Sequence, residues 1–264
     1  MQSDSFDPFD PAASATLLLK TWRAETLLNS LPAELRPHTL QQGYDAQDCL
    51  FKAAGGTRAG WKLGVGSPSA MRAAQLARPL VGQLEAARCH ASGADLQLPT
   101  GAALTIECEI AFVLARDIEP LPNRSVQPDD IRHTCLTFEV VRSRFVDRKR
   151  VGWPSFTADN VGFEALIIGA PACDGLDPQV LRNLAETTVV HLDDEPKAGV
   201  LSGDAATDPL NSLAALYAHA GERGETLRAG DIVSTGALCA PFDITGSGHR
   251  LSVRYLGREL AFSC

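Results

Sequence analysis

The clearest alternation of hydrophobic and polar positions lies in residues 105–114. Alternate residues there are apolar, and two of the positions between them carry Glu107 and Glu109; the apolar set is Ile106, Cys108, Ile110, Phe112 and Leu114. A repeat of two residues is the period of a β-strand, so this stretch predicts a strand. On a strand the two glutamates share one face with Cα atoms about 7 Å apart, whereas on a helix they would point to nearly opposite sides.

Two carboxylates on one face of a largely apolar strand repel each other. If they are half buried, one of them is driven toward its neutral form unless a cation lies between them. Mg²⁺ and Mn²⁺ prefer carboxylate oxygens, so Glu107 and Glu109 are candidate metal ligands. The alternative at this point is a solvated strand edge with two surface acids, which is ordinary in sheets.

The first fifty or so residues carry a helical period instead. One helix is predicted to begin at Asp10 and Pro11, a cap followed by a first-turn proline. Its apolar positions recur at helical spacing; they are Ala15, Leu18, Leu19 and Trp22. A second helix is predicted to begin at Thr39, and the helical pattern ends at Gly55 and Gly56.

Short strands separated by glycine and proline follow this glycine pair. The pattern therefore predicts a helical region over residues 1–56 and a strand-rich region over residues 57–264, expected to form one compact unit.

The first predicted strand, residues 60–65, points Lys62 away from its apolar neighbours and sets it between Gly60 and Gly64. Glycines at these positions leave room for a ligand or for another backbone to approach the lysine. The alternative is a surface lysine on a half-exposed strand. These glycines do not form a dinucleotide-binding loop, because no third glycine is placed to open a helix.

A third acid, Glu139, lies in another apolar strand, predicted over residues 137–141. Before it, Pro128 with acids in the following turn predicts a short helix that ends near Cys135. After it comes a basic cluster that suits either salt bridges or an anionic substrate, namely Arg142, Arg144, Arg148, Lys149 and Arg150. A late helix is predicted to begin at Asp208, and the remaining tail is predicted to be strand.

Composition narrows the function classes. The 264 residues are 45% hydrophobic and 21% charged, as in a folded globular protein. The net charge of −8 argues against binding to a nucleic-acid backbone, which needs a positive field. No apolar run is long enough to cross a bilayer, so we expect a cytoplasmic protein without a membrane partner. The seven cysteines lack metal or redox spacing and are expected to be reduced, and no serine or thiol nucleophile motif is present.

Several short motifs, taken in order, closely resemble the fumarylacetoacetate hydrolase superfamily. More narrowly, the chain is similar to the branch of 2-oxopent-4-enoate hydratases and 4-oxalocrotonate decarboxylases. The resemblance runs from about Leu40 to Phe262. Its motifs are Gly60-Trp61-Lys62-Leu63-Gly64, residues 79–82, Glu107-Cys108-Glu109-Ile110-Ala111, Glu139-Val140-Val141 with Ser143-Arg144, Ala158-Asp159-Asn160, Asp208-Pro209-Leu210-Asn211, and residues 227–233 with Thr235-Gly236.

This resemblance implies a fold of the α+β class, a mixed β-roll with a helical N-terminal region, assembled as a homo-oligomer of two or more chains. It implies a Mg²⁺ or Mn²⁺ held by Glu107, Glu109 and Glu139, to which the carboxylate and 2-oxo oxygens of a 2-keto acid bind. It also implies that Lys62 moves protons as general acid and base. The positions that it assigns to substrate binding are Leu80, Arg144, Asp159 and Asn160.

The implied activity is a lyase of aromatic-compound catabolism that adds water to a 2-hydroxydienoate or 2-oxo-enoate. Three departures from the family pattern bear on it. Hydratases of the family often carry an acid where this chain has Leu80. The family often has a small hydroxyl residue where this chain has Gly162, and Gly-His-Pro where it has Thr207-Asp208-Pro209. Leu80 favours decarboxylation of a 2-oxo acid. The same motifs are also compatible with acylpyruvate hydrolysis and with a non-catalytic partner or 2-keto-acid-binding protein.

Overall fold

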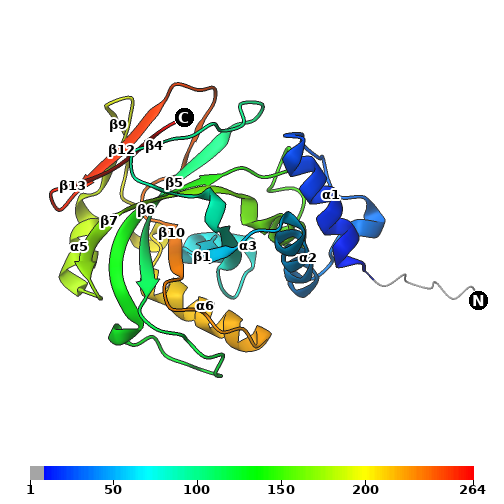
Figure 1. Ribbon diagram of the computed structural model, residues 1–264, viewed down its shortest axis with the longest axis horizontal. Coiled ribbons are helices and arrows are strands. Elements are labelled where there is room, and N and C mark those ends of the chain that lie inside the picture. Colours follow the sequence, from blue (N-terminus) through cyan, green and yellow to red (C-terminus); the bar gives the residue numbers. More distant parts are fainter. Residues whose placement is uncertain (1–8) are drawn as a thin grey trace, which may run out of the picture. The chain divides into compact units, whose positions relative to one another are not determined.

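The structure, a computed structural model, describes residues 9–264, so the first residues of the predicted helical region lie outside the described part. The chain divides into two compact units. The first comprises residues 9–56 together with residues 143–162, and the second comprises residues 57–142 together with residues 163–264. Residues 143–162, which we expected within the strand-rich region, thus belong to the helical unit. Figure 1 traces the chain.

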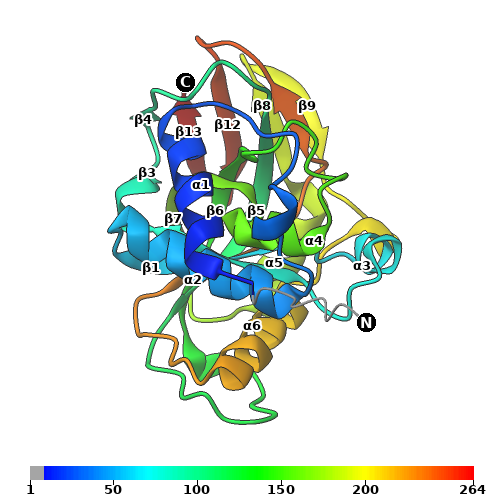
Figure 2. The same ribbon diagram turned by 90° about the vertical axis from the view of Figure 1, so that its right-hand side faces the viewer.

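The first unit is helical, and its sequence sets where the helices begin. Asp10 accepts hydrogen bonds from the backbone of Ala12 and Ala13. Thr39 forms a capping box with Gln42. Both predicted helix starts are therefore confirmed, and the two long helices lie side by side in Figures 1 and 2. The helical elements are α1 (Pro11–Arg23), η1 (Ala33–Leu35), α2 (Leu40–Ala54), α4 (Trp153–Ala158) and η4 (Asn160–Gly162).

One apolar core holds the first unit together. The predicted stripe of α1 is buried in it, along with side chains from α2 and from residues 143–162. Its buried members are Ala15, Leu18, Leu19, Trp22, Leu31, Ala46, Leu50, Phe145 and Ala158. A short parallel bridge between Leu28 and Phe145 ties the two chain segments of this unit together.

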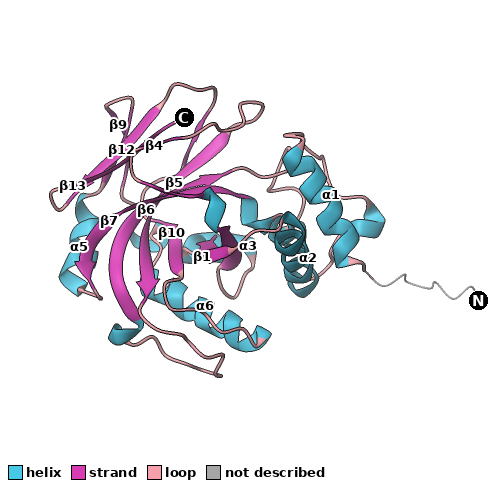
Figure 3. Ribbon diagram, in the orientation of Figure 1, coloured by secondary structure: helices cyan, strands magenta, loops and turns pink. Residues whose placement is uncertain are grey.

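The second unit is built around a large mixed sheet; Figure 3 draws all strands in magenta. Its strands follow the order β2-β1-β10-β5-β6-β7-β3, with β11 also paired to β5. The pairs β1/β10 and β3/β7 are parallel and the others are antiparallel. The bounds are β1 (Arg58–Gly64), β2 (Leu80–Glu85), β3 (Cys89–Ala91), β5 (Leu104–Leu114), β6 (Ile131–Val141), β7 (Phe163–Asp174), β10 (Ile232–Ala237) and β11 (Phe242–Ile244).

A smaller sheet of order β4-β13-β12-β8-β9 belongs to the same unit. Phe138 on β6 meets Phe262 on β13 edge to face, with ring centroids 5.5 Å apart. Because Phe138 alternates with Thr137 and Glu139, the smaller sheet packs on the face opposite to those two side chains. The bounds are β4 (Ala94–Asp95), β8 (Val189–Leu192), β9 (Glu195–Gly199), β12 (Arg250–Tyr255) and β13 (Arg258–Ser263).

Helical segments of the second unit include α6 (Pro209–Arg223), whose predicted start at Asp208 is confirmed by that residue's capping hydrogen bonds. The predicted helix from Pro128 to about Cys135 is wrong beyond Asp130, because β6 begins at Ile131. Pairing with β5 takes up the backbone groups of β6, which outweighs the local helix-start signal. The remaining segments are α3 (Pro68–Ala74), η2 (Ala86–Arg88), η3 (Pro128–Asp130), α5 (Pro178–Thr187) and η5 (Gly203–Ala205).

A helix that crosses a bilayer has to be both long and apolar. Among residues 9–264, none of the helices combines the length and the apolar character that crossing a membrane requires.

Candidate metal centre

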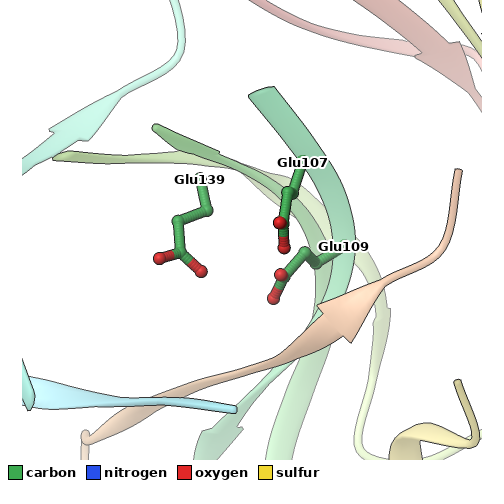
Figure 4. Close-up of side chains that lie close together, drawn as sticks. All are labelled: Glu107, Glu109 and Glu139. Atoms are coloured by element: carbon green, nitrogen blue, oxygen red, sulfur yellow. The ribbon is translucent and has the colours of Figure 1, made fainter. Parts of the chain in front are cut away.

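Three glutamates from two neighbouring strands form an acidic cluster in the second unit (Figure 4). Glu107 and Glu109 lie on β5, and Figure 4 shows both side chains on the same side of it, as predicted. Glu139 on β6 is the direct cross-strand neighbour of Glu107. One carboxylate oxygen from each residue lies within 4.8 Å of the other two. The sheet register therefore gathers three acids around a common space.

Burial makes this cluster electrostatically costly. Glu109 and Glu139 are both 0% exposed, and Glu107 is half-buried. Burial raises the pKa of Glu109 well above its usual range, and the charges of Glu139 and Glu107 raise it further. Two carboxylates within 4.8 Å of each other repel by about 3 kcal/mol at an effective dielectric constant of about 20. The alternative of two solvated surface acids is therefore wrong for Glu109.

The two oxygens of Glu109 have different surroundings. Its Oε2 accepts a hydrogen bond of 2.6 Å from Ser234 Oγ and one of 2.9 Å from the backbone N–H of Gly236. Its Oε1 is buried and accepts no hydrogen bond from any described residue. A buried carboxylate oxygen without a donor is costly unless a cation meets it. The three carboxylates thus fit a hard divalent cation such as Mg²⁺ or Mn²⁺.

Lys62 lies beside this cluster rather than on the surface. The side chain is 2% exposed, and its Nζ forms an ion pair with Glu139 Oε1. The alternative of a surface lysine is therefore wrong. Gly60 lets the backbone of β10 approach closely, because a Cβ at this position would lie 1.9 Å from the carbonyl oxygen of Ile232. The close approach of β10 brings Lys62 into register with Ser234.

Leu80 lies at the start of β2 and is buried. Its cross-strand neighbour is Gly64, and the residue two further along β2, Gly82, is the neighbour of Lys62. Paired residues of a sheet share a face, and so do residues two apart on one strand. The register consequently puts Leu80 on the same face of the sheet as Lys62.

The other three predicted substrate-binding residues, Arg144, Asp159 and Asn160, all lie in the first unit. Arg144 and Asp159 are 0% exposed and form an ion pair through Nε and Oδ1. The backbone N–H of Arg144 and the hydroxyl of Ser143 also donate to Asp159 Oδ2, at 3.0 and 2.8 Å. Burial raises the pKa of Asp159, while the charge of Arg144 acts in the opposite direction. The structure thus pairs Arg144 with Asp159, and their predicted role in substrate binding stays a prediction.

Two residues of the site were missed by sequence reasoning. Ser234 on β10 donates to Glu109, and its hydroxyl lies 2.8 Å from that of Thr137 on β6. Both side chains are fully buried. The signal in the sequence was a hydroxyl inside each of two buried strands, with Thr137 two residues before Glu139. A hydroxyl in a strand is too common to single out without the register of the sheet.

Residues 62–257 match the family described as fumarylacetoacetate (FAA) hydrolase C-terminal. The chain is 30% identical over 194 residues to a 2-keto-4-pentenoate hydratase of Paraburkholderia phymatum, a match that covers 71% of each chain. It is 31% identical over 196 residues to a 2-keto-4-pentenoate hydratase of Burkholderia vietnamiensis, covering 72% of this chain and 71% of the relative.

Solved structures with the same fold include enzymes in complex with metal ions. The 4-oxalocrotonate decarboxylase of Pseudomonas putida G7, complexed with magnesium and adipate, superposes with a TM-score of 0.83 at 22% identity and covers 96% of each chain. The fumarylpyruvate hydrolase of Pseudomonas aeruginosa, in complex with Mn²⁺ and pyruvate, matches with a TM-score of 0.54 at 15% identity, covering 78% of this chain and 89% of that one. These likenesses establish the α+β fold of the chain.

Proposed function

The chain belongs to the fumarylacetoacetate hydrolase family, and from this premise we propose that it is a metal-dependent lyase acting on a 2-keto acid. The reaction that we favour is the addition of water to a 2-hydroxydienoate or 2-oxo-enoate in the catabolism of aromatic compounds. Both hydratase relatives, at 30% and 31% identity, support this reaction.

The observation that carries the proposal is the buried cluster of Glu107, Glu109 and Glu139 with Lys62 beside it. Each glutamate offers one oxygen to a shared space, and three protein ligands leave coordination positions of a six-coordinate ion for a substrate. A bound Mg²⁺ or Mn²⁺ would supply Lewis-acid stabilisation of the negative charge that develops on the 2-oxo oxygen. Glu107, Glu109 and Glu139 would hold this ion.

Lys62 is the residue that we propose to move the proton. Its ion pair with Glu139 holds Nζ at the edge of the cluster, and its burial keeps bulk water away. An ammonium group held in this way can donate a proton to a substrate carbon and, once neutral, take one back from the water molecule that adds to the substrate. Glu139 would thus both hold the metal and orient the proton-transfer group.

Decarboxylation of a 4-oxalocrotonate-type substrate is the second candidate. Leu80 favours it, because a buried leucine on the Lys62 face of the sheet has no polar atom with which to hold a water molecule. Acylpyruvate hydrolysis on the same metal site is a third candidate, recognised by the release of pyruvate and a carboxylic acid. A non-catalytic 2-keto-acid-binding protein, the fourth, would bind the acid with metal but would not turn it over.

The test supplies the purified protein and Mg²⁺ with 2-hydroxypenta-2,4-dienoate, with 4-oxalocrotonate or with an acylpyruvate. Loss of the dienol absorbance, release of CO₂ and the identity of the products separate the three reactions, and binding of a 2-keto acid without turnover identifies the fourth candidate. We expect EDTA and Glu109→Gln each to abolish turnover, whereas Glu259→Gln, a change at an exposed side chain on β13, leaves it intact. Full activity in EDTA, or full activity of the Glu109→Gln variant, would contradict the metal-dependent mechanism.

We also propose that the chain forms a homo-oligomer of two or more copies. This proposal rests on the family resemblance. Light scattering coupled to size-exclusion chromatography measures the mass in solution, and a mass equal to one chain would contradict it.

A further inference from the structure

We propose that the hydroxyls of Ser234 and Thr137 position the carboxylate of Glu109 so that it binds the cation through one oxygen only, as a monodentate ligand. This restriction favours Mg²⁺ over the larger Ca²⁺. This inference rests on the proposed function, since it assumes that the three glutamates hold a divalent ion. It concerns residues to which neither the sequence motifs nor the proposed reaction assigns a role.

The hydroxyls form a chain that ends on Glu109. Thr137 Oγ1 lies 2.8 Å from Ser234 Oγ, which lies 2.6 Å from Glu109 Oε2. An ionised carboxylate only accepts hydrogen bonds, and each hydroxyl has a single proton. Ser234 must therefore donate to Glu109, and Thr137 must donate to Ser234. Each donor is oriented by the one behind it, and all three side chains are 0% exposed.

The backbone of β10 adds a second donor to the same oxygen. The register with β5 shifts between Ser234 and Ala237, which marks a bulge. Within this bulge Gly236 has a φ of 104°, a conformation that favours glycine. Its backbone N–H donates a hydrogen bond of 2.9 Å to Glu109 Oε2. The bulge thus lets the side chain of Ser234 and the amide of Gly236 converge on one atom.

This arrangement gives the two oxygens of Glu109 different hydrogen-bonding environments. Oε2 carries both hydrogen bonds, whereas Oε1 receives none from the described residues. A cation that took both oxygens would have to displace at least one buried donor from Oε2, leaving that donor without a partner. The hydrogen bonds therefore restrict Glu109 to monodentate coordination.

A monodentate carboxylate distinguishes between cations that differ in coordination number and geometry. Mg²⁺ demands six ligands in near-ideal octahedral geometry, whereas Ca²⁺ takes about six to eight ligands and readily binds both oxygens of one carboxylate. A site whose buried carboxylate is limited to one oxygen suits Mg²⁺. Loss of the donors frees Oε2, so discrimination against Ca²⁺ should weaken.

The experiment measures the dissociation constants of MgCl₂ and CaCl₂ by calorimetry on the metal-stripped full-length protein. We expect Ser234→Ala and Thr137→Val each to reduce the preference for Mg²⁺ over Ca²⁺ by about tenfold. Thr137→Ser and Ser234→Thr, which keep a hydroxyl, should retain the wild-type preference. Thr134→Val is the matched control, because the hydroxyl of Thr134 on the same strand bonds to the carbonyl of Gly175 at 2.9 Å.

Thr137→Val keeps the shape of the side chain, so it tests the inference even if Ser234→Ala fails to fold. An unchanged Mg²⁺/Ca²⁺ preference in a folded Thr137→Val protein would overturn the inference and leave the proposed function standing. An equal change in Thr134→Val would also overturn it, because any buried hydroxyl would then have the same effect. Failure of the wild-type protein to bind either ion would instead overturn the proposed function.

Discussion

Glu109→Gln is expected to stabilise the protein when no metal is bound. The change removes one negative charge from the acidic cluster while keeping the shape of the side chain. The new amide oxygen can still accept from Ser234 and Gly236, and the new NH₂ group can donate toward the carboxylates of Glu107 and Glu139. The substitution thus exchanges repulsion for hydrogen bonding.

The magnitude follows from the geometry of the cluster. Carboxylate oxygens within 4.8 Å of one another repel by about 3 kcal/mol per pair at an effective dielectric constant of about 20. Proton uptake by Glu109 in the folded state relieves part of this repulsion, because its pKa is raised. We therefore expect the free energy of unfolding at pH 8 to rise by about 1–2 kcal/mol, a Tm increase of about 2–8 °C.

The pH dependence has a definite sign. A folded-state pKa above the usual 4.5 means that protonated Glu109 contributes stability that is fully present below about pH 4.5 and is lost as the pH rises through the folded-state pKa. Glutamine resembles the protonated acid at every pH. The advantage of Glu109→Gln over the wild type should therefore be small near pH 4.5 and grow as the pH rises.

Thermal unfolding in EDTA at several values from pH 4.5 to 8, followed by circular dichroism, measures this difference. Glu259→Gln is the control, since Glu259 lies on the surface 3.3 Å from Arg250 and its loss should change stability by at most about 0.5 kcal/mol. Added Mg²⁺ at about 100 times its Kd should stabilise the wild type by about 2.7 kcal/mol and the variant by much less. A lower Tm for Glu109→Gln in EDTA at pH 8 would refute the reasoning.

Three further outcomes are expected. Lys62→Met should lower turnover by about 10²–10⁴-fold with Mg²⁺ binding retained in calorimetry, and loss of Mg²⁺ binding would contradict its role as the proton-transfer group. Asp159→Asn leaves the buried charge of Arg144 uncompensated and should lower the free energy of unfolding, measured in urea, by about 3–5 kcal/mol. Asp147→Asn, a change at an exposed side chain, should leave the free energy of unfolding unchanged. Leu80→Asp should raise the ratio of hydration product to CO₂, and an unchanged ratio would exclude Leu80 from the choice of reaction.

The sequence by itself determined the local features of this protein. The two-residue alternation around Glu107 and Glu109 set both side chains on one face of a strand, because side chains two residues apart on a strand point to the same face. The caps at Asp10, Thr39 and Asp208 set where three helices begin, since a cap acts within one turn of helix. Such features need no contact between distant parts of the chain.

Local signals failed where a distant strand competed with them. The acids after Pro128 predicted a helix that would run to about Cys135, but the ladder with β5 draws the chain into β6 from Ile131 onward. The partner strand lies outside the segment whose pattern was read, since Ile131 pairs with Leu114. The sequence pattern alone also had no means of pairing Glu139 with Glu107, and only the resemblance to a family joined them.

Only the tertiary structure decided how the acids are arranged. The register of three strands brings Thr137, Ser234 and Glu109 into one chain of hydrogen bonds, and the bulge in β10 turns the amide of Gly236 toward the same oxygen. Burial then removes the water that would otherwise solvate the carboxylates, which makes Glu109 a candidate ligand rather than a surface acid. Register and burial are properties of the assembled sheet, so no single stretch of sequence contains them.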